Sequence, residues 1–156
     1  LPIYRNISLP VFRRLKTGPF LTVQAERQET QRYMELMNIK AESSAKLVRK
    51  LSGGNQQKVL LGKCLSPAPK VLLVHEPTRG IDVAAKIEIY TLLKKLAREE
   101  QVAVVMVSSD LMEVLNVSDR ILVVYGGGIS GELAAADATE ESVMRLATGV
   151  AKEAAV

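Results

Sequence analysis

The most informative stretch of this 156-residue chain is Leu51-Ser52-Gly53-Gly54-Asn55-Gln56-Gln57. Two adjacent glycines stand where an apolar helical repeat begins, although each costs about 1 kcal/mol relative to alanine inside a helix. Without a Cβ, glycine lets backbone N–H groups approach an anion closely, and the helix dipole favours negative charge at this end. Ser52 adds a hydroxyl donor. The segment suits a terminal phosphate, but a helix–glycine–helix turn with Ser52 as an ordinary N-cap fits these residues equally well.

A second informative segment is Val71-Leu72-Leu73-Val74-His75-Glu76-Pro77-Thr78, an apolar strand that ends in a carboxylate. In doubly wound sheets, ligands bind at the carboxyl ends of the strands. Glu76 is therefore a candidate general base that polarises a water for attack on a γ-phosphate. The alternative is a solvated glutamate before a proline turn. Asp82 follows as a candidate site residue and also as the N-cap of the next helix.

The residue pattern changes near residue 70. Before it, helices are predicted over 24–39, with Tyr33, Met34 and Met37 on one side, over 45–51, and over 55–65. After it, the apolar runs 71–74, 102–107 and 121–125 are typical of strands buried on both faces of a parallel sheet. A helix over 83–98, with Val83, Ile87, Tyr90, Leu93 and Ala97 on its apolar face, joins the first two strands into a βαβ unit.

The last part of the chain reads as a hairpin followed by a helix. Three glycines, 126–128, turn the chain, and 129–133 returns as an antiparallel strand. The final helix begins at Asp137 with Glu140 as a capping-box partner, carries Val143 and Leu146 on its apolar face, and ends at Gly149.

The composition excludes several classes of protein. With 47% hydrophobic and 24% charged residues, the chain is an ordinary globular one, and no apolar run has the roughly 18 residues that span a bilayer. The net charge of +4 is spread along the chain, with two Phe and no Trp for base stacking, so we expect no nucleic-acid partner. The single cysteine, Cys64, excludes a disulfide within the chain, suits a reducing compartment, and is interpreted as a small buried hydrophobic residue.

At this point the sequence resembles the ABC ATPases. The strings Leu-Ser-Gly-Gly-Asn-Gln-Gln-Lys-Val (51–59) and Glu-Pro-Thr-Arg-Gly-Ile-Asp (76–82) are closest to the ATP subunits of bacterial sugar importers, specifically their C-terminal cassette. The resemblance runs from about Asn6 to Gly149 and includes 6–10 and the hairpin at 123–128. Each motif is moderately specific alone, and several in the right order are strongly so.

The resemblance implies a fold and a set of roles. It implies an α/β, P-loop-NTPase-like parallel sheet core, present in part, with an α-helical signature subdomain over 1–66 and the C-terminal part of the ATPase core over 67–156. Glu76 matches the catalytic carboxylate. Residues that match nucleotide contacts, some to ATP on a partner cassette, are Ser52, Gly53, Gly54, Gln56, Asp82 and Ser109. The implied cofactors are ATP and Mg²⁺, and the implied partners are a second cassette and membrane permease subunits at the cytoplasmic face of the inner membrane.

The sequence departs from the family pattern at three points. The phosphate-binding loop Gly-x-x-x-x-Gly-Lys-Ser/Thr is absent, and Gly62-Lys63-Cys64 does not replace it. His75 stands where the family has an aspartate that helps to hold Mg²⁺, and an imidazole is a poor magnesium ligand, so no metal site is predicted. Ser109 stands at the position of the switch histidine, as is often found in the sugar-importer cassettes.

These departures set two expectations and leave rival functions open. We expect the chain alone to hydrolyse no ATP, because nothing cradles the β- and γ-phosphates, and to associate in solution through unpaired strand edges. One rival is a non-catalytic or degenerate module that docks on a permease or partner cassette. Another is a DNA-repair ATPase of ABC type. A third is a dinucleotide-binding enzyme, since 126–131 satisfies Gly-x-Gly-x-x-Gly, although a hairpin turn explains those glycines better. The transported sugar is not encoded in these motifs.

Overall fold

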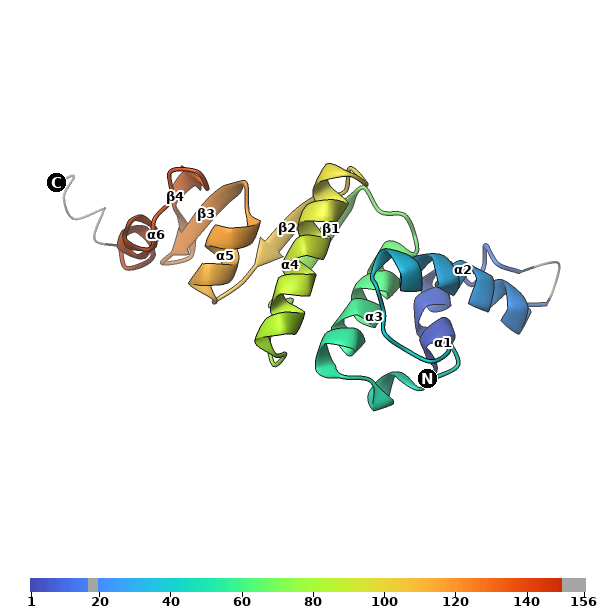
Figure 1. Ribbon diagram of the computed structural model, residues 1–156. Coiled ribbons are helices and arrows are strands. Elements are labelled where there is room, and N and C mark those ends of the chain that lie inside the picture. Colours follow the sequence, from blue (N-terminus) through green and yellow to red (C-terminus); the bar gives the residue numbers. More distant parts are fainter. Residues whose placement is uncertain (17–19, 150–156) are drawn as a thin grey trace. The chain divides into compact units, whose positions relative to one another are not determined.

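The computed structural model describes residues 1–16 and 20–149 and divides into two compact units, Leu1–Val105 and Met106–Val156. Figure 1 shows the helices and strands of both units. This division by contacts falls at a different place from the predicted 1–66 and 67–156 subdomains, which remain a prediction.

The first unit is helical over its first part. Its elements in chain order are α1 (Ile3–Ser8), the 3-10 turn η1 (Leu9–Val11), α2 (Val23–Leu36), the 3-10 turn η2 (Val48–Lys50), α3 (Gly53–Leu65), β1 (Val71–His75), α4 (Val83–Arg98) and β2 (Ala103–Val107), whose last residues cross the unit boundary. The short helix α1 packs against both α2 and α3, and its Ile3 and Ile7 are fully buried. Apolar burial of this kind stabilises a core by roughly 1.5–3 kcal/mol for each fully buried large side chain.

Two of the three predicted helices in this part are present. The helix predicted over 24–39 is α2, which starts one residue earlier because the Thr22 hydroxyl accepts a hydrogen bond from the Ala25 N–H. The prediction of a helix over 45–51 is wrong, because only the short 3-10 turn η2 forms in this segment. The backbone of that segment is used in another way: the Ile3 N–H donates to the Lys46 carbonyl and the Val48 N–H donates to the Leu1 carbonyl. Main-chain groups that pair with a distant segment are not available for a helix.

The predicted βαβ unit is present. β1 and β2 are hydrogen-bonded neighbours, and α4 is the crossover that a parallel pair requires. The bounds of α4 match the prediction, but of its predicted apolar face only Leu93 is buried. Val83 is 73% exposed and Ile87 is 59% exposed, whereas the buried residues are Ile89, Leu92, Leu93 and Leu96. The helix is apolar on more than one side, so its neighbours select the buried face.

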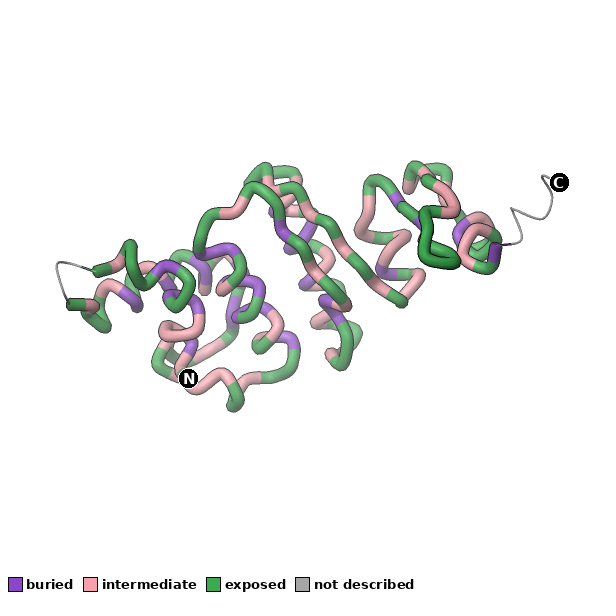
Figure 2. Tube along the Cα trace, turned by 180° about the vertical axis from the view of Figure 1, so that it is seen from behind, coloured by how far each residue is buried: buried purple, intermediate pink, exposed green. Residues whose placement is uncertain are grey.

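The strands of this unit are not buried on both faces, contrary to the prediction. In β1, Leu72 is 3% exposed while its neighbour Leu73 is 74% exposed, and exposed residues alternate with more buried ones along β2 as well (Figure 2). Successive side chains of a strand point to opposite faces. The alternation therefore means that one face of the pair is covered and the other is open in the described residues.

The second unit contains the hairpin and the final helix. Its elements are α5 (Leu111–Val117), which the sequence analysis did not predict, β3 (Arg120–Tyr125), β4 (Gly128–Ala134) and α6 (Glu140–Ala147). β3 and β4 pair antiparallel in a two-stranded sheet, so β3 has an antiparallel neighbour within its own unit. Gly126 and Gly127 form the turn with φ of 58° and 79°, which glycine adopts without strain. The hairpin interpretation of these glycines is confirmed.

The final helix is confirmed, but its cap is a different one from that predicted. Thr139 and Ser142 form the capping box of α6, in place of Asp137 and Glu140. Val143 joins Ile121 and Val123 in the core of this unit, with Leu146 packed against them, and Gly149 follows the helix with φ of 77°. Two further results come from the described residues. Cys64 is exposed and not buried as predicted, and none of the described helices combines the length and the apolar character that a bilayer span needs.

Candidate functional site

The amino end of α3 is open. Ser52 precedes the helix in extended conformation (φ −61°, ψ 156°), as an N-cap residue does, but its side chain makes no capping hydrogen bond. Instead, the Ser52 Oγ accepts a hydrogen bond of 2.9 Å from the Asn55 Nδ2. The interpretation of Ser52 as an ordinary N-cap is therefore wrong for its side chain. The first N–H groups of a helix have no partner within the helix, so this end suits an external anion.

The two glycines of the segment have different surroundings. A Cβ on Gly54 would lie 2.6 Å from the Ala85 Cβ on α4, a distance that real Cβ atoms do not reach. A Cβ on Gly53 would lie 3.3 Å from the Ile81 Cγ2, which is tight but adjustable. Gly54 is thus required for the close packing of α3 on α4, whereas Gly53 is exposed on the open end. Sequence reasoning identified access to the backbone but not this packing role.

Asp82 lies beside this open end and has the role that its sequence position predicted. Its Oδ1 accepts a hydrogen bond of 2.9 Å from the Ala85 N–H, so Asp82 caps α4 and that interpretation is confirmed. A hollow of about 210 Å³ lies between the two helix starts. Its lining residues are Lys40, Ser52, Gly54, Asn55, Asp82, Ala84, Ala85 and Glu88. The structure therefore brings the glycine-rich segment and Asp82 to one place.

A charged cluster of Lys40, Lys58 and Glu88 adjoins this hollow, and Lys40 and Glu88 also line it. The Lys58 side chain is only 3% exposed, and its Nζ donates to the Glu88 Oε2 at 2.7 Å and to the Asn38 carbonyl at 3.0 Å. The Lys40 Nζ lies 3.3 Å from the other Glu88 oxygen. The hydrogen bond from Lys58, followed by its charge, lowers the pKa of Glu88 below its ordinary value. A buried charge needs such partners, so this cluster fixes α3 and the segment after α2 to α4.

Sequence reasoning missed this cluster, although one signal was present. Lys58 stands four residues after Gly54 on α3 and so lies on the same, inward face of the helix. A lysine on a core-facing helical position predicts a buried ion pair, since lysine is almost never fully buried without a partner.

The end of β1 holds the predicted catalytic carboxylate. Glu76 has φ of 49°, in the left-handed region, which costs a residue with a side chain roughly 1–2 kcal/mol. Its carbonyl accepts a hydrogen bond of 3.2 Å from the Arg79 N–H, which closes a turn. Backbone strain of this kind is concentrated at functional sites. The neighbouring His75 is exposed.

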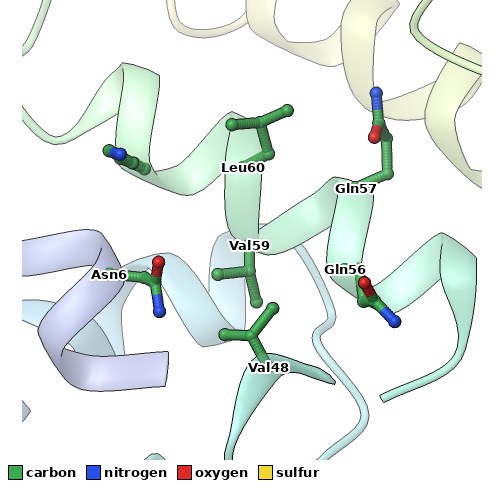
Figure 3. A pocket seen from close by; sticks show the side chains of 7 residues that line it. Asn6, Val48, Gln56, Gln57, Val59 and Leu60 are labelled. Carbon is green, nitrogen blue, oxygen red and sulfur yellow. The ribbon is translucent and has the colours of Figure 1, made fainter. Parts of the chain in front are cut away.

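The other two predicted site residues lie elsewhere. The Gln56 Nε2 donates to the Leu51 carbonyl at 2.9 Å, and Gln56 lines a different hollow of about 250 Å³ together with Asn6, Val48 and Val59 (Figure 3). Ser109 is exposed and belongs to the second unit, in the loop before α5. There, the Ser108 Oγ donates to the buried carboxylate of Glu113 and accepts from the Asp110 N–H.

The donor set at the start of α3 fits an anion better than a cation. It offers backbone N–H groups and one hydroxyl, which bind phosphate oxygens. Magnesium requires several oxygen ligands. In residues 1–16 and 20–149, no three or more His, Cys, Asp or Glu side chains gather in a way that could hold a metal.

Comparisons with known proteins agree with this geometry. Residues 3–79 match the ABC transporter family. The ribose import ATP-binding protein RbsA of Bacillus cereus is 48% identical over 147 residues, which are 94% of this chain and 29% of that protein. The xylose import ATP-binding protein XylG of Moorella thermoacetica is 48% identical over 149 residues, which are 96% of this chain and 29% of that protein. The chain thus spans somewhat under a third of the length of these curated relatives.

A solved structure shows the same fold. It is the dimeric ATP-binding cassette MJ0796 in a post-hydrolysis state bound to ADP and Pi, with a TM-score of 0.71, 25% identity, and coverage of 86% of this chain and 57% of that chain. The α/β cassette fold implied by the sequence is therefore confirmed. With the glycine-rich segment at the open end of α3 and the strand that ends at Glu76, the chain belongs to the ABC transporter family.

Proposed function

We propose that this chain is part of the nucleotide-binding subunit of a bacterial importer that couples ATP hydrolysis to carbohydrate uptake, and that it supplies the signature surface to an ATP bound on a second cassette. The observation that carries the proposal is the open amino end of α3. There, Ser52 does not cap its own helix, and the helix start faces a hollow that Asp82 also lines. The sugar-import names of the relatives support the carbohydrate class.

The residues take complementary roles in this proposal. The Ser52 hydroxyl and the N–H groups of Gly53 and Gly54 donate to the terminal phosphate of the partner's ATP. Glu76 orients the attacking water at the ATP of its own cassette. Asp82 holds the start of α4 at the surface between the two cassettes, while Gln56 and Ser109 contribute to nucleotide contact from the neighbouring segments.

The proposal also covers cofactors, partners and location. ATP and Mg²⁺ are the cofactors of the complete cassette. The partners are a second cassette and the membrane permease, and the subunit acts at the cytoplasmic face of the inner membrane. His75 supplies no oxygen ligand, so the ion is held by groups other than this side chain.

The test uses the chain alone and in a hybrid protein. In the hybrid, the whole chain replaces the segment that it matches in the Bacillus cereus ribose import ATP-binding protein. We expect no phosphate release from MgATP by the chain alone, because it contains no phosphate-binding loop. We expect release by the hybrid, lowered about a hundredfold by Ser52→Ala or Glu76→Gln, as for the loss of one transition-state donor. A matched control is Ser118→Ala, at the residue that follows α5 in the second unit.

Two outcomes would contradict the proposal. Phosphate release by the chain alone that Glu76→Gln abolishes would show that the chain is a complete ATPase. Release by the hybrid that neither variant changes would favour the alternative, a non-catalytic module that docks on a permease or partner cassette.

A further inference from the structure

The hydrogen bond between Asn55 and Ser52 has a direction. The donor is the Asn55 Nδ2, and the Ser52 Oγ lies 2.9 Å away. An amide NH₂ donates and cannot accept, while a hydroxyl does both. The Ser52 oxygen is therefore the acceptor, and its own proton is not used in this contact.

A third group fixes which end of the Asn55 amide faces Ser52. The backbone N–H of Lys40 donates to the Asn55 Oδ1 at 2.8 Å. A backbone N–H can only donate, so it requires the oxygen of the amide and directs the nitrogen to Ser52. The two hydrogen bonds therefore run in one direction only. Lys40 N–H donates to Asn55 Oδ1, and Asn55 Nδ2–H donates to Ser52 Oγ.

The segment that carries the Lys40 N–H is itself fixed. The Ile39 N–H donates to the Met34 carbonyl at 2.9 Å, and the buried Lys58 ammonium donates to the Asn38 carbonyl at 3.0 Å. The Lys40 side chain reaches Glu88 on α4. These three contacts hold residues 38–40 in place. The Lys40 N–H, which donates to Asn55, is therefore fixed, and so is the orientation of the Asn55 amide.

We propose that Asn55 is a positioning residue, which keeps the Ser52 Oγ occupied as an acceptor so that the Ser52 O–H is donated to the phosphoryl group. This inference rests on the proposed function of Ser52. A hydroxyl proton has three staggered positions, and the Asn55 N–H excludes the position that points toward Asn55. The remaining positions face away from Asn55, on the end of α3 where Gly53 is exposed.

The replacement Asn55→Asp separates positioning from packing. Aspartate has the same shape and still accepts from the Lys40 N–H, but its second oxygen accepts where the amide donated. The Ser52 proton then turns inward to the carboxylate. A carboxylate in the first turn of a helix is also favourable for stability, so a purely structural role predicts no loss of function. Ala84→Asp places the same charge on the lining of the same hollow, but from the first turn of α4 instead of α3, and it measures the effect of the added charge.

The experiment measures phosphate release by the hybrid protein at saturating MgATP. We expect Asn55→Ala to lower the rate about threefold, because the hydroxyl regains its three staggered positions. Asn55→Asp should lower the rate of phosphate release at least about tenfold, as for a lost hydrogen bond to a charged group. This loss should be larger than the loss caused by Ala84→Asp. Asn55→Gln retains the amide and should fall between the wild type and Asn55→Ala.

A double variant decides whether Asn55 acts through Ser52. In a Ser52→Ala background, Asn55→Ala should have no further effect, because there is no hydroxyl to orient. Full additivity of the two losses would overturn the inference, since residues that act independently add. A Ser52→Ala variant with the wild-type rate would instead overturn the proposed function, so the two failures are distinguishable.

A measurement on the chain itself tests the geometry without ATP. Amide hydrogen exchange at Lys40 should be slow in the wild type and in Asn55→Asp, and faster in Asn55→Ala, because only the last removes the acceptor of that N–H. Equal exchange at Lys40 in all three proteins would show that the hydrogen bond is not formed in solution, and the inference would fall.

Discussion

Two helices of the first unit, α3 and α4, begin side by side, but only α4 is capped by the side chain of the residue before it. Before α4, Asp82 is extended (φ −72°, ψ 164°) and its carboxylate caps the helix. Before α3, Ser52 is extended in almost the same way (φ −61°, ψ 156°), yet its hydroxyl accepts from Asn55 and leaves the helix uncapped. The comparison teaches that the backbone conformation of a cap does not determine its function. A helix that is closed by its own side chain is stabilised, and one that is left open can bind an external anion.

The largest effect is expected where the two helix starts touch. Gly54→Ala places a methyl group 2.6 Å from the Ala85 Cβ, and such overpacking costs about 1–3 kcal/mol of the free energy of unfolding. Gly53→Ala is the matched control and should change it by less than about 0.5 kcal/mol. Urea denaturation followed by circular dichroism measures both. The double variant Gly54→Ala with Ala85→Gly should recover part of the loss, and no recovery would show that another contact is responsible.

The next effect distinguishes the closed helix start from the open one. Asp82→Ala removes a cap and should lower the free energy of unfolding by about 1 kcal/mol. Ser52→Ala removes no cap and should change it by less than about 0.5 kcal/mol. The same denaturation experiment measures both variants. If Ser52→Ala cost as much as Asp82→Ala, the serine would cap its helix in solution and the contrast between the two helices would be lost.

The smallest effect concerns the ion pair below both helix starts. The pKa of the Glu88 carboxyl is lowered from its ordinary 4.5. The largest cause is the hydrogen bond from Lys58, and the second is the positive charge of Lys58. Because the folded pKa is the lower one, this stabilisation is present above the unfolded pKa and is lost as the pH falls through the folded pKa. Carbon-detected NMR titration should give a Glu88 midpoint below 4.5. Lys58→Met should raise this midpoint more than Lys40→Met does, and equal shifts would contradict the order of the two contacts.

Much of the fold could be predicted from local sequence, and the errors share one cause. The bounds of α4, the glycine turn after β3 and the pairing of β3 with β4 follow from caps, periodicity and turn residues. The buried face of α4, the exposure of Cys64 and the 3-10 turn in place of a helix at 45–51 depend on distant neighbours. At the site, Ser52, Gly54 and Asp82 could be named from motifs. Lys58, Glu88 and the role of Asn55 required the tertiary contacts.

The sequence by itself determined the family, because the motifs at 51–59, 76–82 and 123–128 stand in the order found in the ABC ATPases, although each is only moderately specific alone. It also determined that α4 begins directly after Asp82, since a side-chain cap needs only residues two or three positions away. Only the tertiary structure decided that Ser52 leaves its helix open. Its hydroxyl oxygen accepts a hydrogen bond from Asn55. The amide of Asn55 is oriented by the backbone N–H of Lys40, 15 residues away in the chain. Hydrogen-bond direction is decided by the partners that folding brings together, and a linear sequence does not contain that order.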